Sequence, residues 1–219
     1  MAARARLLLR QFRNMGWKYF VPWVLLFGLI PLLTWRYIQS SGLTPDVYDY
    51  MRPGVYNDFE RYIPMALVWY LVLLFYEFVD NPACELLYAY DGVKKTRLID
   101  LLAVHLHIVL MAALLLFGYQ FILPGLWQEF GRLCIILLVY SCTMYGLMYL
   151  AKSTLFAAMA VVIYHLLGAF MWSDGALFDL FSEMRIDGTQ PPPTNYTPFL
   201  LWAAILLGLG VFLNRRYVK

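Results

Sequence analysis

Charged residues are scarce in this chain of 219 residues. Asp, Glu, Lys and Arg together make up 14% of it, against about a quarter in soluble domains, and 62% of the residues are hydrophobic. No stretch is polar enough to fold as a separate soluble domain. We therefore expect a single transmembrane domain that covers residues 1–219.

The sequence also lacks the motifs that mark several kinds of enzyme. It has no Walker A glycine loop, no serine in a G-x-S-x-G setting, no H-E-x-x-H pair and no cluster of aspartates suited to lipid-headgroup chemistry. Almost no ionisable residue falls in the middle of a predicted span, which argues against a carrier coupled to protons or sodium. We expect no catalytic residue, no metal site and no cofactor in this chain.

Cysteine and histidine are rare, with three of each. The cysteines have neither metal-ligand nor disulfide spacing, so we interpret them as packing residues. His105 and His107 are two residues apart and point about 200° away from each other on a helix, so they cannot chelate one metal ion together. With His165, they are predicted to be hydrogen-bonded packing residues.

Apolar runs separated by polar segments predict an all-α membrane protein with six transmembrane helices. The predicted spans are 19–38, 62–79, 99–123, 132–150, 154–172 and 198–213. Two connections on the outer side are long: 39–61, which is predicted to be an ordered loop rich in proline, glycine and aromatic residues, and 173–197. In the second, apolar residues at helical spacing predict an amphipathic outer helix, 176–184, which packs on the spans and gates the exit; a half-hairpin is the alternative. The gate residues are Leu177, Leu180, Phe181 and Met184.

The distribution of basic residues gives the predicted orientation. Twelve of the 17 Lys and Arg residues fall on the side of both termini and five on the other, so the positive-inside rule places both termini in the cytoplasm. We predict a multi-pass protein of the plasma (inner) membrane, in contact with the lipid bilayer. The basic residues lie beside membrane segments and not on a folded surface, which excludes a nucleic-acid partner. Arg36 and Arg132, at the outer ends of spans, are expected to snorkel to the interface.

The first 18 residues predict an amphipathic interfacial helix, with the clearest helical spacing over 3–18. Its basic face, which meets anionic headgroups, holds Arg6, Arg10 and Arg13. An apolar face that includes Phe12 and Met15 lies about 200° away. A disordered basic tail is the alternative that this spacing leaves open.

The segment between the second and third spans is the most specific feature of the sequence. Asn81 suits a helix N-cap, Pro82 suits the first turn, and Gly92 suits the left-handed position after the last turn, so we predict a short helix at 82–91. Such a helix is about 15 Å long, too short to span a bilayer, and it is too apolar to be left in water. We therefore expect it to dock on a cytoplasmic partner.

Charged residues flank this helix on both sides. Lys94, Lys95 and Arg97 follow it and hold the connection in the cytoplasm. Glu77 lies in the inner end of the second span, where an ionisable group usually has a partner or a task. Two interpretations of Glu77 stay open: a structural pairing with Lys94 or Arg97, and a role in transmitting motion.

The basic interfacial helix, the six spans and the capped cytoplasmic helix together resemble the permease subunit of a type-2 ATP-binding-cassette (ABC) exporter. The resemblance in sequence rests on Glu77, the run Glu85-Leu86-Leu87 and the basic cluster that follows. The chain departs from the family pattern at 82–84, where family members commonly show a Gly-Thr pair, and at Gly92, near where a proline is frequent. The resemblance implies that 82–91 is the coupling helix and that Glu77 and the basic cluster relay its motion. The docking residues that it implies are Glu85, Leu86, Leu87, Tyr88, Tyr90 and Asp91.

The resemblance also implies a function and a set of partners. Two permease subunits, either two copies of this chain or this chain and a relative, would form the pathway for an amphipathic cargo such as a peptide, a drug or a lipid-like molecule. Separate ABC ATPase subunits would bind ATP and Mg and hydrolyse the ATP, so this chain is expected to be a transporter subunit and not an enzyme. Two alternatives stay open: a scaffold or accessory subunit that docks a cytoplasmic partner and transports nothing, and an intramembrane enzyme with an unfamiliar site.

Overall fold

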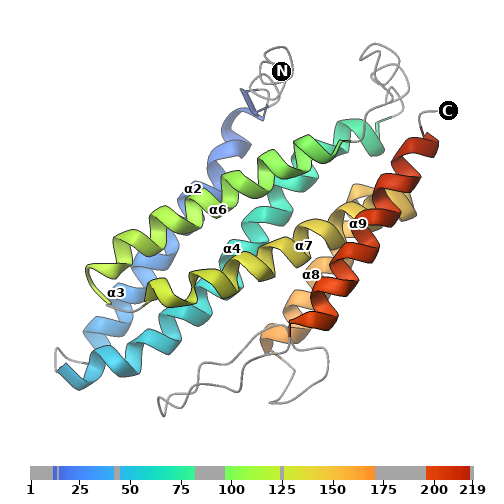
Figure 1. The fold of residues 1–219 in the computed structure, drawn as a ribbon. Coiled ribbons are helices and arrows are strands. Elements are labelled where there is room, and N and C mark those ends of the chain that lie inside the picture. Colours follow the sequence, from blue (N-terminus) through green and yellow to red (C-terminus); the bar gives the residue numbers. More distant parts are fainter. Residues whose placement is uncertain are drawn as a thin grey trace.

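The computed structural model describes residues 12–13, 15–41, 45–81, 97–123, 126–170 and 196–217. Their regular structure is helical throughout, with no strand among them (Figure 1). The elements in chain order are η1 (Gly16–Phe20), α2 (Val21–Val24), η2 (Leu25–Leu29), α3 (Ile30–Ser41), α4 (Pro45–Val79), α6 (Leu98–Gln120), η3 (Leu126–Glu129), α7 (Phe130–Ala151), α8 (Thr154–Phe170) and α9 (Thr197–Tyr217). The elements from η1 to α3 follow one another without a break.

Within the described part of the chain, five helical stretches are long and apolar enough to cross a membrane. They are Gly16–Gln39, Gly54–Val79, Leu98–Gln120, Phe130–Ala151 and Thr197–Arg215. A further apolar helix, Thr154–Gly168 within α8, is shorter than the roughly 20 residues that a bilayer usually requires. The prediction of an all-helical chain with membrane-spanning helices is therefore confirmed in this coarser form, and the sixth span stays a prediction.

Helix α4 corrects the predicted loop at 39–61. The helix begins at Pro45 and runs for 35 residues to Val79, so the second span has no separate start at residue 62. Tyr56 and Phe59 lie about one turn apart in the part that was expected to be loop, and both are completely buried. Their packing stabilises a helix that Pro53, inside it, would by itself disfavour. The other predicted spans begin and end within four residues of a helix boundary.

The N-terminal segment turns at Gly16, so the helix predicted at 3–18 does not run unbroken to residue 18, and its part before residue 12 stays a prediction. Gly16 has a φ of +55°, in the left-handed region that glycine adopts without strain, so a regular helix does not continue through it. Before this turn, Phe12 and Met15 pack against the core while Arg13 is exposed, as the predicted two-faced pattern requires. Residues 1–11, with Arg6 and Arg10, lie outside the described residues.

The long helices run alternately up and down the bundle (Figure 1). The start of η1, the end of α4, the start of α6 and the end of α9 lie at one end of the molecule in this view. The turn between α7 and α8 lies at this end as well. The end of α4 and the start of α6 border the segment that holds the predicted coupling helix, so we call this end the coupling end. We call the opposite end the far end.

Helix α7 lies at the centre of the bundle and packs against α4, α6, α8 and α9. Its closest approach is to α9: a Cβ atom on Gly146 would lie 2.6 Å from the carbonyl oxygen of Leu206, and one on Gly210 would lie 2.6 Å from the ring of Tyr145. The buried Asn214 side chain of α9 also donates a hydrogen bond to the Tyr145 hydroxyl at 3.0 Å. Close backbone approach through small residues is a common way for membrane helices to associate.

Candidate functional site

Most of the predicted site residues lie outside the described part of the chain. These are Glu85, Leu86, Leu87, Tyr88, Tyr90 and Asp91 of the coupling helix, Lys94 and Lys95 of the basic cluster, Arg6 and Arg10 of the interfacial helix, and Leu177, Leu180, Phe181 and Met184 of the outer gate. Their roles stay predictions. Glu77, Arg97 and Arg13 are described, and the first two lie where the predicted coupling segment joins the bundle.

Arg97 fixes the start of α6 to the end of α4. Its guanidinium carbon lies 4.0 Å from the centre of the Phe78 ring, in a cation–π contact between the two helices. Nη1 of Arg97 also donates to Oδ2 of Asp100, one turn into α6, at 3.4 Å. Arg97 and Asp100 are both buried, so the pair is poorly screened by solvent. The two borders of the segment 82–96 are therefore joined to each other by side chains that the structure describes.

Asp80 connects the same border to a third helix. Its carboxylate accepts hydrogen bonds from the backbone N–H of Thr154 and from the Thr154 hydroxyl, at the first residue of α8. A carboxylate at this place satisfies unpaired N–H groups and complements the positive end of the helix dipole. The Ser153 hydroxyl oxygen accepts a further hydrogen bond from the N–H of Phe156 at 3.3 Å. Two side chains thus cap the first turn of α8: Ser153, which directly precedes the helix, and Asp80, which directly follows α4.

Glu77 is exposed on the last turns of α4. The described ion pair of Arg97 is with Asp100, so the structure gives no support to a pairing of Arg97 with Glu77. Lys94, the other predicted partner, lies outside the described residues. A role for Glu77 in transmitting motion stays a prediction.

A buried group of charged residues lies at the far end, where the sequence interpretation placed a loop. Asp58 and Glu60 of α4 and Glu129 at the start of α7 are each at most 6% exposed. Arg132 of α7 donates to Glu129 at 3.1 Å and to the Tyr196 hydroxyl at 2.9 Å. Arg132 is thus partly buried and paired with Glu129, whereas Arg36 is exposed. That both snorkel to the interface stays a prediction.

The signal for this buried group was present in the sequence. Val55, Tyr56, Phe59 and Ile63 recur at helical spacing, and all four are completely buried. Pro53-Gly54 just before them favoured a loop instead. The loop predicted over 39–61 therefore includes Asp58 and Glu60.

The three histidines are hydrogen-bonded packing residues, as predicted. His105 lies 2.9 Å from the Ser141 hydroxyl, and His165 lies 3.0 Å from the Tyr140 hydroxyl. His107 lies 3.3 Å from the Tyr19 hydroxyl, inside a group of aromatic rings that joins the N-terminal segment to α4 and α6. Among the described residues, no group of three or more His, Cys, Asp or Glu side chains is placed to hold a metal ion.

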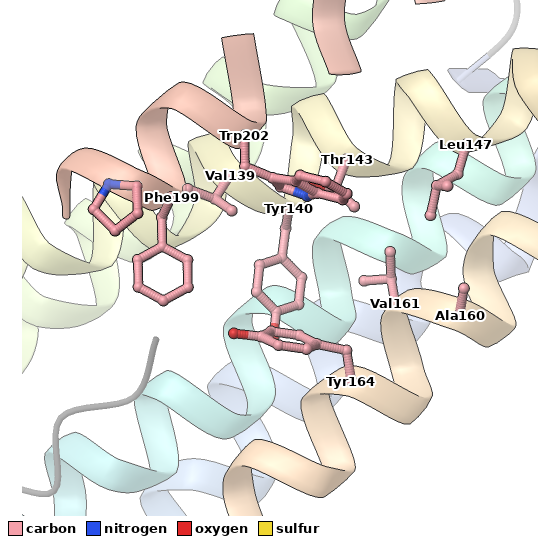
Figure 2. A pocket seen from close by; sticks show the side chains of 10 residues that line it. Val139, Tyr140, Thr143, Leu147, Ala160, Val161, Tyr164, Phe199 and Trp202 are labelled. Carbon is pink, nitrogen blue, oxygen red and sulfur yellow. The ribbon is translucent and has the colours of Figure 1, made fainter. Parts of the chain in front are cut away.

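A cavity of about 440 Å³ lies between α7, α8 and α9 (Figure 2). In Figure 2, Phe199 and Trp202 of α9 lie on one side of it and Val161 and Tyr164 of α8 on the other. No lining residue is charged, and the Tyr140 hydroxyl at its wall is engaged with His165. The full lining is Val139, Tyr140, Thr143, Leu147, Ala160, Val161, Tyr164, Pro198, Phe199 and Trp202. Its size is within the roughly 300–1,000 Å³ of small-molecule sites.

Two small residues of α8, Ala157 and Ala158, are buried in the bundle, and a third, Ala160, lines the cavity. The closest helix approach described above lies instead between α7 and α9.

Comparisons with known proteins give this chain no relative. No protein-family model, no curated protein and no solved structure matches it. The class that the structure itself defines is an all-helical protein with several helices long and apolar enough to cross a membrane.

Proposed function

We propose that this chain is the membrane-spanning permease subunit of an ABC-2-type exporter. It forms, with a second permease subunit, the pathway for an amphipathic cargo, and separate ATPase subunits supply the energy. In this proposal α8 is the sixth span, both termini are cytoplasmic, and the coupling end of the bundle faces the ATPase.

The observation that carries the proposal is that side-chain contacts attach both borders of the segment 82–96 to helices of the bundle. A docked helix moves the membrane helices only if its two ends are attached to them. Arg97 lies on the Phe78 ring at 4.0 Å, and Asp80 caps α8 through Thr154, with donor–acceptor distances of 3.0 and 3.3 Å to its backbone N–H. Motion at 82–96 would therefore reach α4, α6 and α8 together, which is what a coupling element requires.

The lipid-facing character of the helices supports the same proposal. Large apolar side chains such as Leu106, Leu110 and Phe117 of α6 are more than half exposed, while Asp58, Glu60 and His165 are buried inside the bundle. This is the distribution expected of a chain whose surroundings are hydrocarbon.

The test is purification in a mild detergent from cells that express the chain at natural levels, followed by identification of bound proteins. A P-loop ATPase that copurifies, and ATP-dependent export in sealed vesicles, are the expected results. Copurification of a cytoplasmic protein without nucleotide-binding motifs would favour the scaffold or accessory subunit instead.

A further inference from the structure

The cavity between α7, α8 and α9 is a slot that runs along the helices. Val139, Thr143 and Leu147 line it at positions i, i+4 and i+8, which form one stripe on α7. This stripe is roughly 12 Å long at 1.5 Å per residue. A ligand that fills the slot therefore lies parallel to the helix axes, which is also the direction of lipid chains around a membrane-spanning helix.

The side chains at the rim of the slot belong to the lipid-facing surface. Trp202 lines the slot and is 52% exposed, and its neighbours Leu201 and Ile205 on α9 are more than half exposed. On α8, Met159 and Ile163 are exposed beside the lining residues Ala160 and Tyr164. The slot thus opens sideways toward hydrocarbon.

The dimensions of the slot suit a single chain that lies along the helices. The slot has about 440 Å³ and a lining stripe roughly 12 Å long, so a linear hydrocarbon chain can lie in it lengthwise.

The polar groups near the slot do not select a charged ligand. The Tyr140 hydroxyl is bonded to His165. Arg132, which lies two turns before Val139 on the same face of α7, is neutralised by Glu129 at 3.1 Å. Recognition in the slot therefore rests on its apolar and aromatic walls.

We propose that this slot binds one acyl chain of a lipid or lipid-like molecule, which enters sideways from the bilayer. The binding follows from the geometry of α7, α8 and α9 alone. That acyl-chain-bearing molecules are also the exported cargo is a consequence that rests on the proposed function.

The experiment uses the full chain in phospholipid nanodiscs, without any ATPase, and a fatty acid that carries a photoreactive diazirine and an alkyne tag. Adducts are mapped by mass spectrometry after illumination. Adducts should concentrate on Thr143, Tyr164 and Trp202, and an excess of unlabelled palmitic acid should compete them away. Labelling of the lipid-facing residues Leu110 and Phe117 of α6 should not be competed.

Two alanine variants provide a matched pair. Ala160→Phe places a ring in the slot and should lower the labelling there about tenfold, the equivalent of about 1.4 kcal/mol in binding. Ala204→Phe adds the same ring at an exposed position of α9 outside the slot and should leave the labelling unchanged. Labelling that is spread evenly over α6 and the slot, or that palmitic acid does not compete, would overturn the proposal whether or not Ala160→Phe folds. The labelling is done without any ATPase, so a negative labelling result would not contradict the exporter proposal. In the same way, failure to copurify an ATPase would contradict the exporter proposal but not acyl-chain binding.

Discussion

Asp80, just beyond the end of α4, caps α8 by accepting two hydrogen bonds from the backbone N–H of Thr154, at 3.0 Å and 3.3 Å to its two carboxylate oxygens. These residues are 74 positions apart, so the contact ties together helices that the chain sequence separates. The same contact stabilises the first turn of α8 and connects α8 to the border of the predicted coupling helix.

Asp80→Ala should destabilise the protein by about 1 kcal/mol, because it leaves the backbone N–H of Thr154, the first residue of α8, without its acceptor. Asp80→Asn keeps one oxygen acceptor and should lose less. The measurement is thermal unfolding of the purified chain in detergent, with both variants compared with the wild type. Equal melting temperatures for wild type and Asp80→Ala would show that this cap does not stabilise α8.

The contact between α7 and α9 gives a prediction with an internal control. Gly146→Ala places a methyl group 2.6 Å from the Leu206 carbonyl oxygen, so the two helix backbones must separate, and overpacking of this kind costs about 1–3 kcal/mol. Gly208→Ala, on α9 itself, has no atom within 4 Å of the added carbon and should be neutral or stabilising, because alanine favours a helix over glycine by about 1 kcal/mol. Unfolding curves in detergent distinguish the two. If Gly208→Ala lost as much stability as Gly146→Ala, helix contact would not be the reason for the loss.

Hydropathy in the sequence was enough to find the long apolar helices, because their length and composition are local properties. It did not give the correct start of α4. Pro53 and Gly54 are typical of a loop, but the burial of Tyr56 and Phe59 stabilises a helix there. The misplaced boundary also hid the buried charges, since Asp58 and Glu60 fall within the loop predicted over 39–61.

Contacts between distant residues carried no local signal at all. Nothing near Asp80 in the sequence indicates Thr154, and nothing near Gly146 indicates Leu206, because these pairs depend on how the helices are arranged in space. The left-handed turn at Gly16 had a possible signal in the glycine itself, yet the regular spacing of basic residues before it favoured one uninterrupted helix.

The topology of six spans can be tested by labelling single cysteines in sealed cells after Cys84, Cys134 and Cys142 have been replaced by alanine. Lys94→Cys should be protected from a membrane-impermeant maleimide and Leu43→Cys should react, because twelve of the 17 basic residues fall on the side of residue 94. Lys94→Cys should react once the cells are opened. Reaction of Lys94→Cys in sealed cells would contradict the proposed orientation.

The apolar side chains of the segment 82–91 are expected to fill a groove on the ATPase. Burying a leucine fully contributes roughly 1.5–3 kcal/mol, and a carboxylate in its place also meets a desolvation cost of several kcal/mol. Leu86→Asp, or Leu87→Asp if the register differs by one residue, should therefore weaken ATPase binding at least about tenfold, since 1.4 kcal/mol is one decade. Leu86→Met keeps an apolar side chain and is the matched control.

Glu77→Gln separates docking from the transmission of motion. Glu77 is exposed on α4 and lies one residue before Phe78, on which Arg97 rests, so loss of its charge should leave the ATPase bound while transport falls. The measurements for each variant are ATPase copurification, substrate-stimulated ATP hydrolysis and export. If both aspartate variants kept full ATPase binding and full stimulated hydrolysis, the segment would not be the coupling element. The exporter proposal would then lose its sequence-specific support, because the contacts of Asp80 and Arg97 explain how motion would be passed on but do not identify what the segment binds.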